Sequence, residues 1–100
     1  MNAASPTDVQ VVHNPGASRF EATVEGQLCV ADYYLDGQRM VMNHTGVPRA
    51  LEGRGIAARL VAAAFAHAAR EGLTIVPQCS YVAVWARRHP EQAAGVVAGG

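Results

Sequence analysis

The sequence predicts a single α/β domain with a mixed sheet: an antiparallel meander, then a strand-helix-strand crossover and a short C-terminal helix. Apolar and polar residues alternate in the first half of the chain, which is the period of a strand with one exposed face. After Pro48 the apolar residues recur at helical spacing instead. Because 100 residues, half of them hydrophobic, leave room for only one core, these elements must pack together.

The meander is predicted to contain four strands. An Asn-Pro-Gly turn at residues 14–16 ends the first, and Glu25-Gly26 turns the chain after the second. Asp36-Gly37 is predicted to form the hairpin turn that follows the third strand, because both central positions of such turns favour positive φ. The predicted strands cover residues 9–13, 20–24, 27–35 and 39–45.

Helical periodicity predicts a long helix that Gly72 ends. A short apolar strand follows and should lie parallel to the fourth strand, because such crossovers are right-handed. Ser80 is the expected N-cap of a second helix. The helices are predicted over residues 55–70 and 80–88, and the strand over residues 73–77.

Residues 8–91 are predicted to form the domain. Residues 1–7 and 92–100 carry no periodic pattern and are expected to be flexible tails. No apolar run approaches the ~20 residues of a membrane span, and no basic and apolar leader opens the chain. A cytoplasmic protein with no membrane partner is therefore expected, as a monomer or a weak homodimer.

Charge and cysteine usage exclude several classes of function. Eight arginines balance eight acidic residues, so the chain lacks the basic excess of a nucleic-acid binder and no nucleic-acid partner is expected. The absence of lysine excludes Schiff-base chemistry and a lysine-type Walker loop. Cys29 and Cys79 are too few for a zinc knuckle or a disulfide framework, so free thiols and no metal are expected.

The loop before the long helix is the most informative segment. Gly53 and Gly55 let the backbone expose several N–H groups at the positive end of the helix dipole, an arrangement that holds a phosphate or pyrophosphate. Arg49, Arg54 and Arg59 surround this turn, and guanidinium groups match phosphate oxygens. The alternative is a tight helix entry with a solvated basic rim, as in a general interaction domain.

Three ordered motifs carry a family resemblance: His44-Thr45-Gly46-Val47-Pro48, Gly55-Ile56-Ala57, and Cys79-Ser80-Tyr81-Val82, with Arg88-His89-Pro90 as an ending. Over about residues 20–91 the chain resembles the minimal, single-domain branch of the GNAT N-acetyltransferase superfamily. One position departs from the pattern, because Glu52 stands where the superfamily usually has Arg or Gln. A carboxylate there would repel a pyrophosphate unless its side chain points outward.

The resemblance implies a GNAT-like fold and acetyl-CoA as the cofactor. The pyrophosphate would sit on the N–H groups at the helix start, and the pantetheine arm would pair with the end of the fourth strand. The thioester would then lie near Cys79 and Tyr81. The implied cofactor-binding residues are Thr45, Gly46, Val47, Gly53, Arg54, Gly55, Ile56 and Ala57.

The implied activity is acetyl transfer from acetyl-CoA to an amine on a small molecule or a protein; the alternative is a CoA or acyl-CoA binding module without turnover. His44 is the candidate base, or else a strand histidine, and Tyr81 is the candidate proton donor to the departing thiolate. Cys79 accepts the acetyl group, donates a proton or lines the pantetheine tunnel. The other three histidines are assigned no role, and His67 is expected to face outward.

Overall fold

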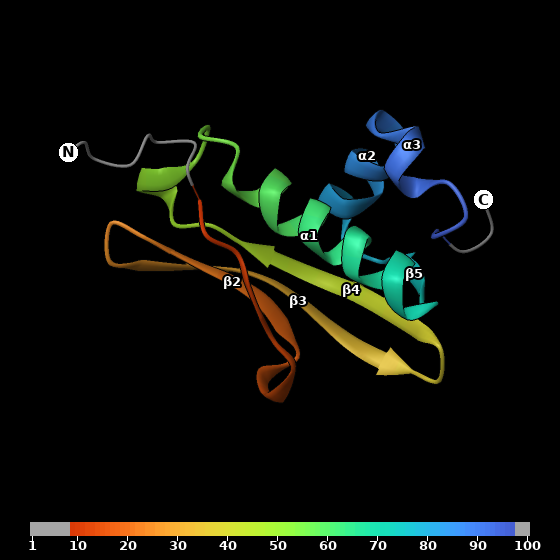
Figure 1. The fold of residues 1–100 in the computed structure, drawn as a ribbon. Coiled ribbons are helices and arrows are strands. Elements are labelled where there is room, and N and C mark those ends of the chain that lie inside the picture. Colours follow the sequence, from red (N-terminus) through yellow and green to blue (C-terminus); the bar gives the residue numbers. More distant parts are fainter. Residues whose placement is uncertain (1–8, 98–100) are drawn as a thin grey trace.

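The computed structural model describes residues 9–97 as a five-stranded sheet with helices on one face (Figure 1). The strand order β1-β2-β3-β4-β5 follows the chain, and the first four strands are antiparallel neighbours. β5 pairs parallel with β4, which confirms the predicted mixed sheet. The strands are β1 (Val12–Asn14), β2 (Arg19–Val24), β3 (Gln27–Asp36), β4 (Arg39–Gly46) and β5 (Thr74–Pro77).

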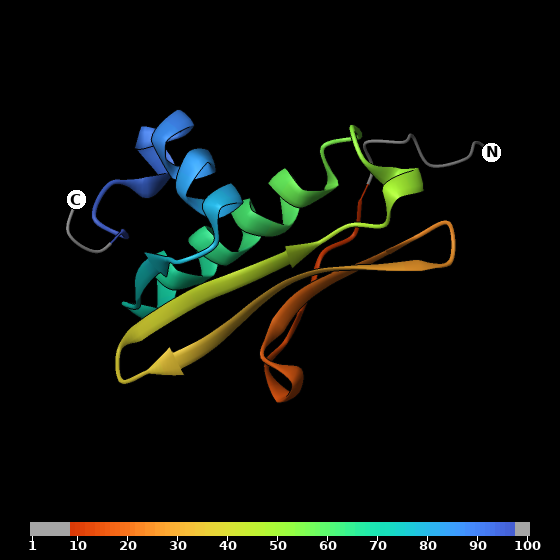
Figure 2. The ribbon, with the colours of Figure 1, turned by 180° about the vertical axis from the view of Figure 1, so that it is seen from behind.

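The helices pack on the same face of the sheet, as the front and back views agree (Figures 1 and 2). The crossover from β4 to β5 runs through α1, and α2 follows β5, so both predicted helices are confirmed within a residue at their ends. The helical segments are η1 (Pro15–Ala17), η2 (Arg49–Leu51), α1 (Ile56–Glu71), α2 (Ser80–Arg88) and α3 (Pro90–Ala93). Within residues 9–97 no helix combines the length and apolarity that crossing a membrane requires.

The core lies between the sheet and the helices. Phe65 of α1 packs against Trp85 of α2 with ring centroids 4.8 Å apart, while Met40 and Met42 of β4 are fully buried beneath the helix layer. Burying each such side chain stabilises the fold by about 1.5–3 kcal/mol. This packing fixes α1 on the sheet and therefore places its N-terminus beside the end of β4.

Two predicted boundaries in the meander were wrong. The first strand was expected over residues 9–13, but β1 begins at Val12, and residues 9 and 11 pack partly buried against the core without strand pairing. The hairpin after β3 turns at Gly37 and Gln38 rather than at Asp36-Gly37, because Asp36 still pairs with Arg39. A single residue with positive φ, Gly37 at +61°, sits in this turn.

The expectation of a flexible tail over residues 92–100 is corrected for residues 92–97. Val96 is 6% exposed, and its carbonyl accepts a hydrogen bond of 2.7 Å from the backbone N–H of Ile75 in β5. Val97 forms an isolated parallel bridge with the same residue. Apolar burial beside the sheet edge thus extends the packed region to Val97, whereas the tails predicted at residues 1–7 and 98–100 lie outside the described residues.

Candidate functional site

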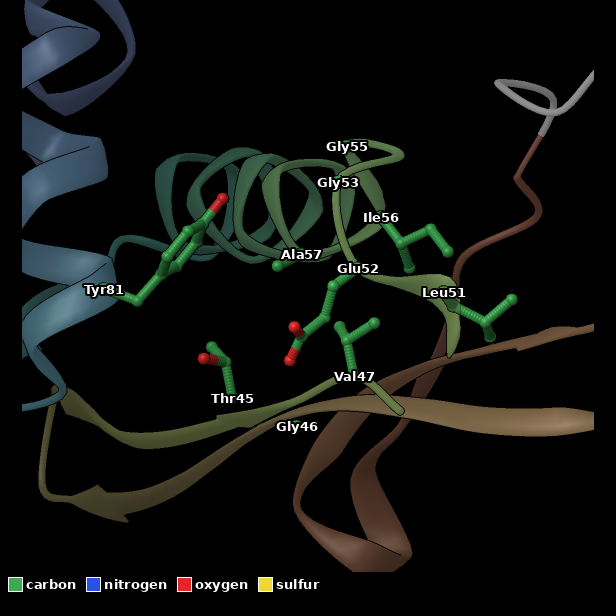
Figure 3. A pocket seen from close by; sticks show the side chains of 10 residues that line it. All are labelled: Thr45, Gly46, Val47, Leu51, Glu52, Gly53, Gly55, Ile56, Ala57 and Tyr81. Carbon is green, nitrogen blue, oxygen red and sulfur yellow. The ribbon is translucent and has the colours of Figure 1, made fainter. Parts of the chain in front are cut away.

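A cavity of about 540 Å³ opens where β4, the loop after η2, the start of α1 and the first turn of α2 meet (Figure 3). Its volume falls within the range of small-molecule pockets. All predicted cofactor-binding residues except Arg54 line it. The lining residues are Thr45, Gly46, Val47, Leu51, Glu52, Gly53, Gly55, Ile56, Ala57 and Tyr81.

The N-terminus of α1 forms one wall of this cavity. Gly55 is its N-cap with φ +79°, and Gly53 has φ +83°, so both glycines adopt the left-handed conformation that other residues rarely take. The first intrahelical hydrogen bond runs from the N–H of Arg59 to the carbonyl of Gly55, at 3.2 Å. The N–H groups of the preceding helical residues therefore have no acceptor within the helix and are available to an anion.

The edge of β4 forms the floor. Pairing with β5 ends at Met42 opposite Pro77, whereas β4 continues to Gly46. The N–H of Cys79 donates to the carbonyl of Met42 at 2.9 Å, and the chain then turns away into α2. Among the described strands, none pairs with this side of β4 beyond Met42. The exposed backbone can hydrogen-bond to an extended ligand lying beside it as an added strand.

A β-bulge in β4 decides which side chains face the cavity. Asp32 pairs with His44 and the next residue, Tyr33, pairs with Met42, so Asn43 is an extra residue in β4. The bulge reverses the side-chain alternation. Met42 and Thr45 consequently lie on the same, helix-covered side of the sheet.

His44 lies on the opposite side of the sheet. It is exposed, does not line the cavity, and its Nε2 atom lies 3.1 Å from where a Cβ on Gly46 would be. The structure therefore does not bring the candidate base together with Cys79 and Tyr81. The alternation of side chains along the sequence could not predict which side of the sheet His44 lies on, because the extra residue, Asn43, comes directly before it.

Cys79 does not itself line the cavity, but its Sγ atom lies 3.8 Å from Oγ1 of Thr45, which does. It is the N-cap of α2, which corrects the prediction of Ser80 as cap, although the thiol makes no capping hydrogen bond. Burial raises the pKa of the thiol, but the backbones of Val82 and Tyr81 and both the side chain and backbone of Thr45 stabilise the thiolate. The balance lowers the pKa of Cys79 below its ordinary value.

Tyr81 lines the cavity from the first turn of α2 (Figure 3). Its side chain is 38% exposed, and burial raises its pKa. The phenol is therefore protonated at neutral pH and able to donate a proton.

Two lining residues were not among the predicted binding residues. Leu51 is fully buried and anchors η2 to the core, so it fixes the loop before α1; an apolar residue within a polar loop was the signal for it. The side chain of Glu52 extends into the cavity, with its carboxylate toward Thr45 and Val47 (Figure 3). The outward orientation that would spare a pyrophosphate from its charge is not observed.

Arg54 does not line the cavity and instead forms an ion pair with Glu25, whose Oε2 atom lies 2.6 Å from Nη1 of the arginine. Arg49 and Arg59 are exposed, as a basic rim would be.

A cluster of aromatic side chains at the far end of α1 was not predicted. His67 was expected to face outward, but it is half-buried with its ring centroid 4.4 Å from that of His13. His13 stacks on Phe20, and its Nε2 atom is 2.7 Å from the hydroxyl of Tyr33. His13, Tyr33 and His67 line a second cavity of about 510 Å³ together with Glu71. Their juxtaposition depends on β1 pairing with β2, which no spacing along the chain reveals.

Comparison with known families identifies the relationship. The sequence model of the GCN5-related N-acetyl-transferase family matches residues 19–96. The match includes β2 to β5, the three α-helices and every residue that lines the first cavity. It confirms the resemblance that the three ordered motifs indicated. The chain belongs to the GCN5-related N-acetyltransferase family.

Proposed function

We propose that the protein transfers an acetyl group from acetyl-CoA to an amine. Membership in the family supports acetyltransferase activity in general. The observation that carries the finer proposal is one continuous cavity with three parts: free helix N–H groups, an unpaired strand edge, and Tyr81, with the Cys79 thiol beside the cavity at 3.8 Å from Oγ1 of Thr45. These match, in order, an anionic end, an extended amide-containing arm and a reactive thioester.

The residues of the cavity fit CoA at two of its parts. The N–H groups of Ile56 and Ala57 would hold the pyrophosphate, since they precede the first hydrogen bond of α1. The backbone of Thr45 to Val47 would pair with the amides of the pantetheine arm. Glu52 opposes this fit, because its carboxylate shares the cavity with the anionic end. Acetyl-CoA supplies an acetyl group already activated as a thioester.

Transfer to an amine requires a neutral amine and a proton for the departing thiolate. A primary alkyl amine has a pKa near ~10.4, so its neutral form at pH 7 costs about 4–5 kcal/mol. A desolvated position beside the apolar lining residues Val47 and Ile56 lowers this cost. Tyr81 is protonated and lines the cavity, so it is the proposed proton donor to the thiolate.

The lowered pKa of Cys79 supports a role for this thiol in the reaction. In a covalent route, its sulfur attacks the thioester carbonyl, the CoA thiolate leaves, and the amine then displaces the acetyl group from Cys79. In a direct route the amine attacks the thioester itself, and Cys79 lines the pantetheine tunnel or donates a proton. The acceptor, on a small molecule or a protein, stays a prediction, as do the cytoplasmic location and the monomer or weak homodimer.

Binding and turnover together test the proposal. Acetyl-CoA at millimolar concentration should raise the unfolding temperature, because a ligand that binds only the folded state stabilises it. A panel of amines with acetyl-CoA should then yield acetylated product and free thiol. Stabilisation without product for any amine would instead indicate the binding module, and the absence of stabilisation beside a known CoA-binding control would refute the proposal.

A further inference from the structure

The ion pair between Arg54 and Glu25 connects the helix-entry turn to a distant hairpin. Arg54 stands between the two left-handed glycines that open α1, and Glu25 forms the turn between β2 and β3, 29 residues earlier. The two side chains are 34% and 60% exposed, with 2.6 Å between Nη1 and Oε2. Solvent therefore reaches the pair, and Gly53 and Gly55, the residues on either side of Arg54, line the first cavity.

The conformation of Glu25 is unusual for its residue type. Its φ is +51°, followed by +76° at Gly26, so a glutamate occupies a turn position that Asn, Asp and Gly favour. A residue without a stabilising side-chain cap in this region stores backbone strain, which points to a role for its side chain. The strained turn holds the carboxylate against Arg54.

Two carboxylates reduce the positive charge available to an anion at the start of α1. The carboxylate of Glu52 already lies inside the cavity, and Glu25 neutralises the arginine of the turn that precedes α1. A phosphate reaching the N–H groups of α1 thus encounters Arg54 already paired. Guanidinium groups bind phosphates bidentately, so a donor phosphate is a strong competitor for this arginine.

We propose that Glu25 is a determinant of donor affinity: it competes with a phosphate of the donor for Arg54, which leaves Glu25 when the donor binds. This inference rests on the proposed function, because it assumes a phosphate-bearing donor in the first cavity. Exposed ion pairs are weak, which limits the effect of removing Glu25 to about a fivefold gain in affinity.

A double-mutant cycle tests the competition by calorimetric titration with acetyl-CoA. Glu25→Gln should tighten binding by about two- to fivefold, because Arg54 no longer exchanges partners. Arg54→Gln should weaken binding. In the Arg54→Gln background, Glu25→Gln should leave the affinity unchanged. Asp36→Asn serves as the charge control, since it removes one negative charge at the opposite end of β3 and should have little effect.

The outcomes separate this inference from the proposed function. Tightening by Glu25→Gln that persists without Arg54 would show a general charge effect and overturn the competition, as would an unchanged affinity in the single variant. If neither the wild type nor any folded variant binds acetyl-CoA, the proposed function fails and this inference with it. In the wild type, the Nε–Hε NMR resonance of Arg54 should shift on addition of acetyl-CoA, and an unshifted resonance at saturation would also overturn the exchange of partners.

Discussion

The two cysteines occupy contrasting environments although both are free thiols. Cys29 faces the core from β3, is fully buried, and has a pKa raised by burial. Cys79 sits at the N-terminus of α2, where backbone groups and Thr45 lower its pKa. The thiolate is the nucleophile, so reactivity should follow this difference.

Alkylation should therefore occur at Cys79 and leave Cys29 unmodified in the folded protein. The rate at Cys79 should rise with pH and reach half its maximum below the pH that a free cysteine requires, because its pKa is lowered. Thr45→Val should move that midpoint upward by removing the side-chain contact with the sulfur. Peptide mass spectrometry after short exposure to iodoacetamide at several pH values measures both rates; equal rates at the two cysteines would contradict the assignment.

Glu52 should reduce the affinity for a phosphorylated donor, because its carboxylate extends into the cavity. Replacing it with the isosteric Gln removes the charge and restores a residue type that the family motif contains. At an effective dielectric between those of water and protein, one charge within several ångströms contributes about 1 kcal/mol, so Glu52→Gln should tighten acetyl-CoA binding about fivefold. Glu91→Gln, on α3 and outside the cavity lining, is the matched control. Weaker binding by Glu52→Gln would assign the carboxylate a favourable contact instead.

At the scale of the element, β1 is attached to the rest of the fold by side-chain contacts as well as by backbone pairing. It has only three residues and lies at the edge of the sheet. His13 connects it to β2 through Phe20, to β3 through Tyr33 and to α1 through His67. The titration of this imidazole is thus coupled to the attachment of β1.

Stability should fall between neutral pH and pH 5 because of His13. Burial lowers its pKa in the folded protein, and the charge of the nearby His67 lowers it further. The unfolded chain, with a histidine pKa near ~6.5, therefore binds more protons than the folded one as the pH drops through that value. The stability that neutral His13 contributes is fully present above the unfolded pKa. It is lost as the pH falls through the lowered pKa of His13 in the folded protein.

Urea unfolding at pH 7.5 and pH 5 measures the loss of unfolding free energy. His67→Asn should make this loss smaller, because it removes one of the two causes of the lowered His13 pKa. His89→Asn is the control, because that histidine stacks on Trp85 away from β1. An identical pH dependence in the wild type and His67→Asn would exclude coupling between the two imidazoles.

At the scale of the whole molecule, the segment after α3 belongs to the packed structure. Val96 is buried beside β5, so Val96→Ala should cost about 1–3 kcal/mol of unfolding free energy through lost burial and an incompletely closed void. Val12→Ala, at a side chain 58% exposed on the opposite edge, should cost little. Urea unfolding compares the two variants, and equal costs would contradict the packing of Val96.

The periodicities and motifs of the sequence predicted most of the fold and most of the cavity lining. Helical spacing identified α1, and the two glycines before it identified the turn that lines the cavity beside its N-terminus. His44 lies on the side of the sheet away from the cavity because a bulge at Asn43 reverses the side-chain alternation, and the sequence pattern cannot reveal an extra residue. The contacts of Arg54 with Glu25 and of His67 with His13 join residues far apart in the chain, so local patterns carry no signal for them.

The contact between Thr45 and Cys79 also constrains when the site forms. Its two atoms belong to residues 34 positions apart, and between them the chain must complete α1 and add β5 beside β4. Parallel pairing of this kind requires closure of a long loop, and the entropy is lost before the new contacts stabilise the pair. We therefore expect it to form late in folding. A chain in which only the antiparallel meander has formed therefore lacks the first cavity, because the start of α1 and the first turn of α2 supply part of its lining.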